Sequence, residues 1–504
     1  MSVLVALIVP CFAAYMLIRA CDRGAPQTAS TVGLHFGLAV GLGLGLSSCS
    51  CFLGLWGFGR LGYAFFALET LGFIGLSLIG LFSTRLRPIQ SGADSPSDLP
   101  QSQSLSVGRW NGVLSATLLL SVLLAATGVT GLYVAEPYGE WDAWSIWNVR
   151  ARSLLLAGEH WRQAFDCAVH PDYPLLVPAT SVRLWAYSGA DNTWTPALAG
   201  SLFTFATAGI LLFGLCRLRN VSMALLAGMA LMGNVAYLTR GASQYADVPL
   251  GFFMLATVLL FALHDAQEQP SLGLLGLAGM TAGLAAWTKN EGQMFLVVVA
   301  LTRIVIGWKQ GGASAVMRQT AVFLAGSAPA ILVLGLFKMS VLVGNDLVTG
   351  QDWHATLSRL SDGSRYLFVL ERLVHYLFRV GKAYIVILPL AWLLLGGARD
   401  RSGKVLPGIV VILSMMLAGY LMVYVVTPHD LAWHVNTSMD RLLVQLWPIL
   451  LLAVFWYLAD PVHLARGAAE ETPACTVGGP ATTRTERTRT LVPAARSRRR
   501  SMVS

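Results

Sequence analysis

The chain has 504 residues, of which 55% are hydrophobic and 12% charged, and its formal net charge is +9. Soluble domains carry about 25% charged residues, so the composition excludes an ordinary soluble protein. Apolar runs of membrane-spanning length recur from end to end, and such runs cross a bilayer as helices because lipid offers the backbone no hydrogen-bond partners. The composition therefore predicts an all-α polytopic membrane protein.

The apolar runs predict about thirteen transmembrane helices when a span is taken as ~20 residues. The first run has no basic residues before it, which indicates a retained helix and not a cleaved signal peptide. In chain order, the approximate cores are residues 2–19, 32–56, 61–84, 112–135, 196–216, 221–239, 247–264, 271–287, 293–308, 319–343, 383–397, 405–427 and 441–459.

Lysine and arginine residues in short connections predict the orientation, because such loops stay on the cytoplasmic side. If these residues all lie inside, inner and outer loops alternate along the chain without conflict, although the short inner loop 265–270 has no basic residue. The long segments 136–195 and 344–382 then lie outside. The predicted location is the plasma membrane (the inner membrane of a bacterium), with an active site on the periplasmic or extracellular side. The basic residues are Arg19, Arg23, Arg85, Arg87, Arg109, Arg217, Arg219, Lys309, Arg318, Arg399, Arg401 and Lys404.

Four regions follow from these patterns. Residues 1–84 are predicted to be accessory transmembrane helices, and 85–111, rich in Ser, Pro, Asp and Gln, a flexible cytoplasmic linker. Residues 112–460 form the predicted membrane core, and 461–504 a disordered basic cytoplasmic tail. A basic tail after a membrane domain predicts contact with membrane lipids and not with nucleic acid. The seven scattered cysteines show neither a disulfide framework nor a zinc site.

Two features lie within the first spans. The second span carries glycines at four-residue spacing, which let helix backbones approach closely. Glu69 lies inside the third span, where an acid is either functional or paired with a neighbouring helix, and we favour the pairing. The glycines are Gly33, Gly37, Gly41 and Gly45.

The stretch after residues 112–135 places acids at the end of a membrane helix. Tryptophan favours the membrane–water boundary, because its ring is apolar and its N–H forms hydrogen bonds with water. A carboxylate held at that boundary can meet a lipid head group and a water-borne hydroxyl together. The alternative is a solvated loop acid beside an aromatic belt. The acids are Glu140 and Asp142, and the tryptophans are Trp141, Trp144 and Trp147.

The segment that follows predicts an amphipathic helix lying in the interface. Asn148 and Arg152 fall on its polar face. Beyond it, prolines on both sides of Asp172 and Tyr173 predict a rigid extended loop, 170–174. The apolar face of the helix consists of Trp144, Trp147, Ala151, Leu154 and Leu155.

Short polar clusters at the predicted outer ends of the apolar helices favour chemistry at one membrane surface. A transporter would instead place ionisable groups near the midplane, between inverted halves, and the sequence shows no clear internal repeat. The clusters are Glu140 and Asp142 with His170 and Asp172; residues 245–249; residues 289–292; and His429, Asp430, His434, Asp440 and Arg441.

Transfer from a phosphate-linked lipid needs a base for the acceptor and cations for the departing phosphate. Asp142 is the predicted base, with Glu140 as the other candidate. Lys289 and Arg441 are the predicted phosphate ligands. The other substrate-binding candidates are His170, Asp172, Tyr173, Tyr245, Asp247, Glu291, His429 and His434.

Each of these residues also has a purely structural interpretation. Lys289 could extend along the helix to the interface, and Arg441 could anchor a helix end. The histidines could be hydrogen-bonded within loops, and Asp247 could cap the helix that begins before Pro249.

The sequence WDAW at 141–144, after a long apolar helix, resembles the first outer loop of the GT-C superfamily of polytopic glycosyltransferases. The pattern is most similar to the bacterial family 39-like proteins, relatives of the protein O-mannosyltransferases and of the lipid A aminoarabinose transferase. Asp142 and Ala143 are similar to their Asp-Glu-Ala motif, although the adjacent Glu is missing here. The sequence YADVPLGFF at 245–253 matches their Asp-x-Pro-Leu-x-Phe pattern, and Lys289 resembles their outer lysine near the lipid phosphate.

The resemblance covers roughly residues 112–460 and implies a GT-C-like helical core with interfacial helices in the outer loops. It implies inverting transfer of a sugar from a polyprenyl-phosphate donor to a hydroxyl or amine of a glycan, lipid or protein. Some members use a divalent metal, for which Asp142, Asp247 and His170 could supply ligands. The competing hypotheses are a flippase for a lipid-linked sugar, which needs essential charges deep in the spans such as Glu69, and a non-catalytic assembly subunit.

Overall fold

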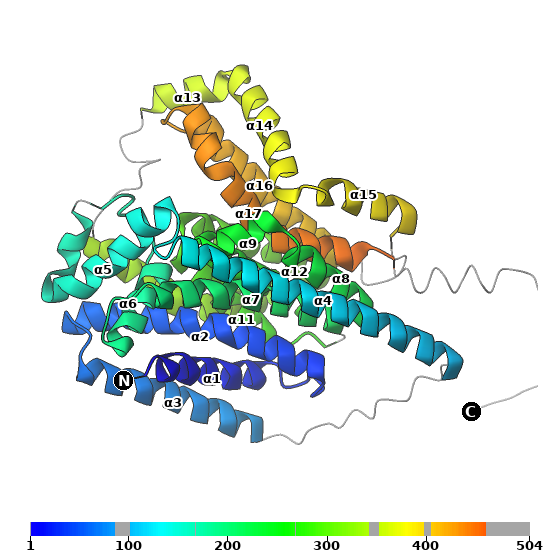
Figure 1. Ribbon diagram of the computed structural model, residues 1–504, viewed down its shortest axis with the longest axis horizontal. Helices are drawn as coiled ribbons and strands as arrows, with labels where there is room; N and C mark the ends of the chain where they lie inside the picture. Colours follow the sequence, from blue (N-terminus) through cyan, green and yellow to red (C-terminus); the bar gives the residue numbers. More distant parts are fainter. Residues whose placement is uncertain are drawn as a thin grey trace, which may run out of the picture. The chain divides into compact units, whose positions relative to one another are not determined.

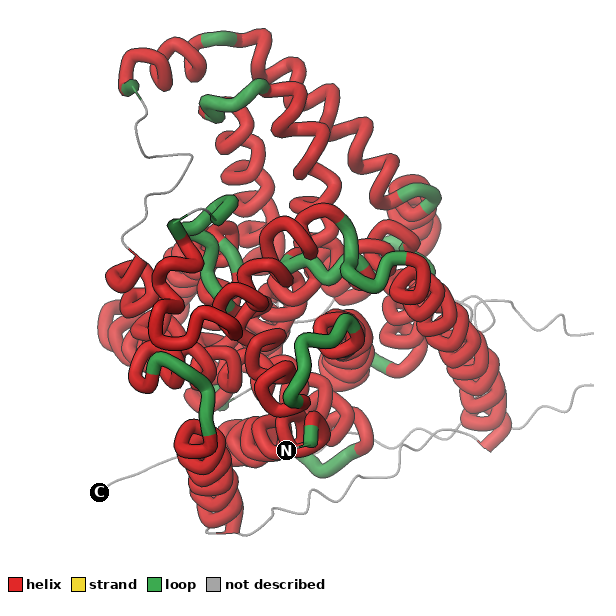
Figure 2. Tube along the Cα trace, turned by 60° about the vertical axis from the view of Figure 1, so that its left-hand side comes forward, coloured by secondary structure: helices red, strands yellow, loops and turns green. Residues whose placement is uncertain are grey.

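The computed structural model describes residues 2–85, 101–166, 168–267, 269–341, 352–397 and 405–459. Most of the predicted linker and the whole basic tail lie outside the described residues, as do Arg399, Arg401 and Lys404. Within the described residues the chain is helical throughout, with one isolated bridge between Gly397 and Leu458 and no strand (Figure 2). The predicted all-α architecture is confirmed for this part of the chain.

Figure 1 shows the arrangement of the helices. In chain order they are α1 (Val3–Cys21), α2 (Ala29–Phe58), α3 (Tyr63–Arg85), α4 (Gln101–Ala135), the π-helical turn η1 (Ala143–Trp147), α5 (Asn148–Ala157), the 3-10 helix η2 (Gly158–Phe165), α6 (Leu176–Ser188), α7 (Trp194–Leu218), α8 (Val221–Met232), α9 (Val235–Ala242), α10 (Asp247–Asp265), α11 (Leu272–Thr288), α12 (Asn290–Val341), α13 (Trp353–Ser361), α14 (Gly363–Gly381), α15 (Tyr384–Leu395), α16 (Val405–Val426) and α17 (Leu431–Tyr457).

Ten helical segments in the described residues are long and apolar enough to cross a membrane, or up to twelve if two bent pairs each count as one span. The bent pairs are α8 with α9, at 62°, and α14 with α15, at 84°. Helix α11 has 17 residues, so at ~1.5 Å per residue it is shorter than the ~30 Å hydrocarbon core. The chain is therefore a multi-pass helical protein, and the exact number of thirteen spans stays a prediction.

Helix α10 is the centre of the bundle. Every residue of its apolar window is buried, and it packs against α7, α11 and α17. A helix that is hydrophobic on all sides is stable only inside a protein or a membrane. Phe252 and Phe253 fill the contact with Phe203 of α7. The position of α10 matters for function, because its first residue is Asp247.

Helix α2 is also part of the core. A Cβ atom built on Gly37 would lie 2.9 Å from Ile210, and one on Gly45 would lie 2.7 Å from Leu284. The glycine stripe therefore permits close helix packing, as predicted. Figure 1 shows α1, α2 and α3 side by side, with α2 packed against α7. All the described helices belong to one compact unit, and the division into accessory helices and a core stays a prediction.

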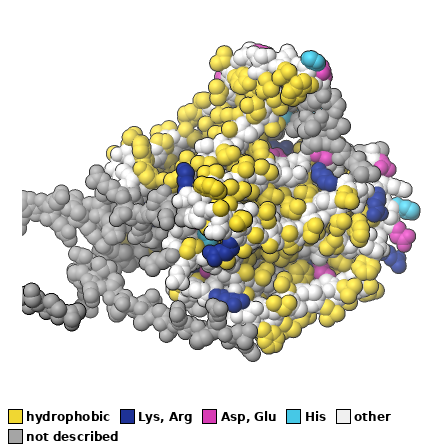
Figure 3. Space-filling model, turned by 180° about the vertical axis from the view of Figure 1, so that it is seen from behind, with side chains coloured by type: hydrophobic (Ala, Val, Ile, Leu, Met, Phe, Trp, Pro, Cys, Tyr) yellow, Lys and Arg dark blue, Asp and Glu magenta, His cyan; other side chains and the backbone are white. Residues whose placement is uncertain are grey.

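Two further observations refine the predicted regions. Helix α4 begins at Gln101, so residues 101–111 of the expected linker are helical. Hydrophobic side chains cover most of one face of the molecule, and charged side chains gather towards its margins (Figure 3). Such a surface agrees with helices that cross a membrane.

Candidate functional site

The site is built around Asp247, whose side chain is 0% exposed. Its carboxylate accepts hydrogen bonds from Lys289 Nζ at 3.1 Å, Arg441 Nε at 3.0 Å and Gln445 Nε2 at 2.6 Å. Lys289 lies between α11 and α12, and the other two lie one turn apart on α17. The carboxylate therefore joins three parts of the bundle at the start of α10. It does not cap that helix, because its oxygens bond to these side chains.

Arg441 joins Asp247 to the predicted base. Its Nη1 atom lies 2.7 Å from Asp142 Oδ2, while its Nε binds Asp247. The planar guanidinium carries its donors in a rigid fork, so it fixes the directions of two carboxylates more strictly than an ammonium does. We call Asp142, Asp247, Lys289, Glu291 and Arg441 the Asp247 cluster.

Lys289 is the second cation of the cluster. Its ammonium lies 3.1 Å from Asp247 and 2.8 Å from Glu291, in the first turn of α12. Burial opposes the charge of Lys289, but the two carboxylates outweigh it and raise its pKa. The corner is tight, because a Cβ atom on Gly292 would collide with the backbone of Ala285. Glycine is therefore required where α12 folds back on α11.

Tyr245 links the two sequence motifs that resemble the GT-C pattern. Its hydroxyl accepts a hydrogen bond of 3.1 Å from the backbone N–H of Asp142. Two guanidinium groups contact its ring, that of Arg441 at 4.8 Å and that of Arg240 at 5.6 Å from the centroid. Burial raises the pKa of Tyr245 to about 12. The neutral phenol therefore holds the backbone of Asp142 beside Arg441.

Glu140 belongs to a neighbouring ion-pair network. Arg240, on α9, lies 2.5 Å from Glu140 and 2.7 Å from Asp440. The side chain of Glu140 is 31% exposed, compared with 17% for Asp142. The two acids therefore differ in their partners as well as in their exposure to solvent. Of the two, it is Asp142 that shares the guanidinium of Arg441 with Asp247.

The loop at residues 170–174 is a tight turn and not the extended segment predicted from its prolines. The N–H of Tyr173 donates to the carbonyl of His170 at 3.0 Å, and His170 has a φ of 50°. Proline at the second position favours such a turn, because its ring fixes φ near −65°. The predicted rigidity has a different source, described next.

Buried Arg150 holds this turn through its backbone. Its guanidinium donates to the carbonyls of Val169 and His170, both at 2.7 Å, and of Tyr173 at 3.3 Å. Lys338, near the end of α12, donates to the carbonyl of Asp172. Two cations therefore bind four backbone carbonyls of one short loop. Burial lowers the pKa of Arg150 to about 10, so it remains a cation at neutral pH.

The turn presents Asp172 and Tyr173 towards the cluster. Asn290, next to Lys289 in the chain, donates to Asp172 at 2.7 Å. The ring of Tyr173 is stacked on His170, with centroids 4.7 Å apart, and on Trp147 at 5.7 Å. Asp172 thus links the turn to the corner that carries Lys289, while His170 is the outer ring of an aromatic stack.

The histidines predicted to assist lie earlier in the chain than Arg441, with His429 just before α17 and His434 near its start. His434 Nδ1 lies 2.9 Å from the hydroxyl of Thr427, and His429 packs edge-to-face against Trp433. His434 is two turns before Arg441, which corresponds to ~10 Å along a helix. The contacts described for both histidines are therefore with residues outside the Asp247 cluster.

A helix is found where the amphipathic segment was predicted, and its position in a membrane interface stays a prediction. Trp147, Ala151 and Leu154 are buried as expected, and Arg152 is exposed. Trp144 is 45% exposed, because η1 is π-helical and its wider turn shifts the register of the residues before α5. Trp144 instead packs edge-to-face against exposed Trp141, beside Asp142.

Within the described residues, no three His, Cys, Asp or Glu side chains are arranged to hold a metal ion. Asp142 and Asp247 both face Arg441, and His170 stacks on Tyr173. These three residues, predicted as possible ligands, are therefore not brought together as one ligand set.

Comparisons with protein-family models, with curated proteins and with solved structures find no match for this chain. The resemblance to the GT-C superfamily therefore rests on the sequence motifs alone. A fold does not by itself identify a function, so the functional argument rests on the geometry of the site.

The site contains residues that sequence reasoning missed. Gln445 lies four residues after Arg441, and this spacing on a helix could have indicated a shared partner. Arg240 lies five residues before the Tyr245 motif, an unusual place for a charge in an apolar stretch. Nothing in the sequence around Arg150 indicates that it binds the carbonyls of a distant turn.

Proposed function

We propose that this protein is an inverting glycosyltransferase that moves a sugar from a polyprenyl-phosphate donor to an acceptor hydroxyl or amine. The observation that carries the proposal is Arg441, whose guanidinium is shared between Asp142 and buried Asp247. A second cation, Lys289, lies against the same Asp247. A candidate base and two candidate phosphate ligands therefore meet where several apolar helices begin or end.

The fully buried Asp247 has the role of orienting the cations. With no exposed surface, it does not reach a substrate, but it holds Lys289 and Arg441 in fixed directions. Preorganised cations stabilise the charge that develops on a leaving phosphate without reorganisation during the reaction. This proposal replaces the predicted substrate-binding role of Asp247.

The shared guanidinium offers a way to couple donor binding to the base. The phosphate of the donor competes with Asp142 for Arg441, because phosphate carries a strong negative charge and matches the guanidinium fork. Asp142 loses its ion-pair partner when it is displaced, so its carboxylate is free to accept a hydrogen bond from the acceptor. The base is thereby activated when the donor is in place.

The chemical step follows from this arrangement. Asp142 takes the proton of the acceptor as its oxygen or nitrogen forms a bond to the anomeric carbon. The bond between that carbon and the phosphate oxygen breaks, and the polyprenyl phosphate leaves with the electron pair. Arg441 and Lys289 stabilise this phosphate. Attack from the face opposite the leaving group inverts the anomeric centre.

The test uses purified protein, a radiolabelled polyprenyl-phosphate hexose and a total membrane extract as acceptor. We expect label to leave the lipid with wild-type protein, and Asp142→Asn to reduce this rate by about 10²–10⁴-fold. Asp352→Asn is the matched control, because it makes the same change at a helix cap where asparagine serves equally well. Equal rates for Asp142→Asn and the control would contradict the proposal.

The competing flippase predicts a different outcome in the same system. Label would cross a vesicle membrane while remaining attached to its lipid. Such a result, with no cleavage of the donor, would replace the transferase by a transporter.

A further inference from the structure

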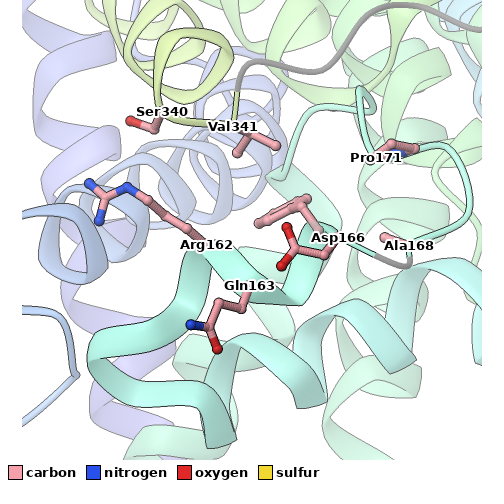
Figure 4. Close-up of a pocket in the computed structure, with 8 residues that line it drawn as sticks. Arg162, Gln163, Asp166, Ala168, Pro171, Ser340 and Val341 are labelled. Atoms are coloured by element: carbon pink, nitrogen blue, oxygen red, sulfur yellow. The ribbon is translucent and has the colours of Figure 1, made fainter.

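An open cavity of 480 Å³ lies beside the turn that carries Asp172. Its volume is within the range of about 300–1,000 Å³ that is typical of small-molecule sites. Figure 4 shows Arg162 in η2 and Asp166 just after it, with Ser340 and Val341 of α12 on one side and Pro171 on the other. Gln163 of η2 also lines the cavity. The cavity is distinct from the Asp247 cluster, and nothing in the proposed chemistry so far uses it.

The turn at residues 170–174 lies between the cavity and the corner that carries Lys289. Pro171 lines the cavity, whereas its neighbour Asp172 is buried against Asn290, next to Lys289. Neighbouring Cα atoms are about 3.8 Å apart, so the two surfaces of this turn lie on adjacent residues. The turn is also held firmly, because Arg150 and Lys338 bind its backbone carbonyls. The turn therefore lines the cavity with Pro171 and contacts Asn290, the neighbour of Lys289, with Asp172.

The lining has the character of a carbohydrate site. Arg162 and Asp166 contribute one charge of each sign, so together they select neither a cation nor an anion. Gln163 and Ser340 add an amide and a hydroxyl that can donate and accept hydrogen bonds. Pro171 and Val341, both partly exposed, add apolar surface. A sugar ring presents the matching combination of hydroxyl groups that donate and accept with an apolar C–H face.

Arg162 is held in place within this lining. Its guanidinium lies 4.6 Å from the centroid of the Trp161 ring, in a cation–π contact. Trp161 is buried and packs edge-to-face against Phe165. The donors of Arg162 are therefore presented by an ordered side chain, which reduces the entropy lost when a ligand binds.

We infer that this cavity binds a neutral sugar residue of the acceptor and thereby makes a glycan or glycolipid the acceptor class. The inference rests on the proposed glycosyltransferase activity. The acceptor sugar occupies the cavity between η2 and the end of α12, and its reacting hydroxyl extends past Pro171 towards Asp142.

The experiment fills the cavity from two sides. Gln163→Trp and Ser340→Trp each place a large ring in it, and His160→Trp is the control on the exposed side of the same helix η2. With the radiolabelled donor, transfer to the membrane extract is measured against hydrolysis of the donor by water. Transfer is followed across a series of extract concentrations, and each variant is first checked for an unchanged unfolding temperature.

We expect both filling variants to lower the ratio of transfer to hydrolysis at least tenfold and to raise the half-saturating extract concentration, while His160→Trp matches wild type. Treating the extract with a glycosidase mixture should also remove its acceptor activity. Wild-type ratios in both filling variants would overturn the acceptor assignment and leave the transferase intact. Absence of donor cleavage by wild-type protein would remove the transferase, and this assignment with it.

Discussion

Two charged clusters in this protein differ in whether solvent can reach them. In the first, Glu69 of α3 accepts from Arg183 Nε at 2.8 Å, from the Tyr187 hydroxyl at 2.7 Å and from Ser50. Arg183 donates in addition to the carbonyl of Ala6 at 2.6 Å. Both charged side chains are at most 3% exposed. This Glu69 cluster is closed, because protein atoms occupy the hydrogen-bonding groups on both sides.

The Asp247 cluster is instead open on one side. Arg441 is 11% and Asp142 17% exposed, and Arg441 is shared between Asp142 and Asp247. A charge pair that is buried and fully hydrogen-bonded serves packing, since opening it costs several kcal/mol. A cation shared by two acids at the edge of solvent can exchange one of them for a ligand. The predicted partner for Glu69 is confirmed, and the comparison explains why the transferase proposal uses Asp142.

The largest effect is expected from Arg441→Gln. This change leaves Asp142 and Asp247 without their common cation, and it leaves the departing phosphate with Lys289 as its remaining donor. We expect transfer to fall by about 10²–10³-fold, the usual loss when one preorganised donor is removed. Arg441→Lys keeps the charge but not the two-sided fork, so it should restore only part of the rate. If the Gln variant transferred sugar within a few-fold of the wild-type rate, Arg441 would not be needed for transfer, and the functional contrast between the two clusters would be contradicted.

Glu69→Gln should act on stability and not on chemistry. Removing one charge leaves Arg183 buried without its counter-ion, which costs about 3–5 kcal/mol. We expect a lower unfolding temperature in detergent and an unchanged transfer rate per folded molecule. The double variant Glu69→Leu with Arg183→Met should recover much of the stability, because apolar side chains can replace a buried pair. Lost activity with unchanged stability would contradict this and favour the flippase.

Glu140→Gln distinguishes the two candidate bases. Arg240 keeps Asp440 as a partner when Glu140 loses its charge, and the Asp247 cluster is untouched. We therefore expect transfer to fall less than about tenfold, below the range for removal of a general base. Glu140→Ala provides a second comparison. A loss as large as that of Asp142→Asn would assign the base role to Glu140.

The smallest effect is expected from Tyr245→Phe, which removes one hydrogen bond to the backbone of Asp142. We expect a loss of about 1 kcal/mol in unfolding free energy at neutral pH. The raised pKa of about 12 adds a pH dependence. Between pH 10 and 12 the unfolded chain releases a proton that folded Tyr245 keeps, so stability falls as pH rises.

Without the phenol, the decline in stability across that window should be smaller in the variant. Unfolding midpoints of both proteins at pH 8, 10 and 11 measure this difference. Parallel curves would show that the hydroxyl of Tyr245 is not held neutral by its surroundings.

Some of the site could be predicted, because local patterns identified its polar segments. The motifs around Asp142, Asp247, Lys289 and Arg441 each lie at the end of an apolar run, and the structure brings all four together. Other expectations depended on backbone detail that composition does not contain. The extended loop at 170–174 proved to be a turn, and the π-helical η1 turned Trp144 outward.

The sequence by itself determined that the chain is a helical membrane protein and where most of its apolar helices run, because hydrophobicity and length act locally along the chain. It also determined that polar residues gather at the helix ends. Only the tertiary structure decided which of them meet. The contact between Asp142 and Arg441 joins residues about 300 positions apart. Arg150 binds backbone carbonyls of a turn, and because every residue has a carbonyl, the sequence gives no sign of this contact. Such contacts depend on how whole helices pack.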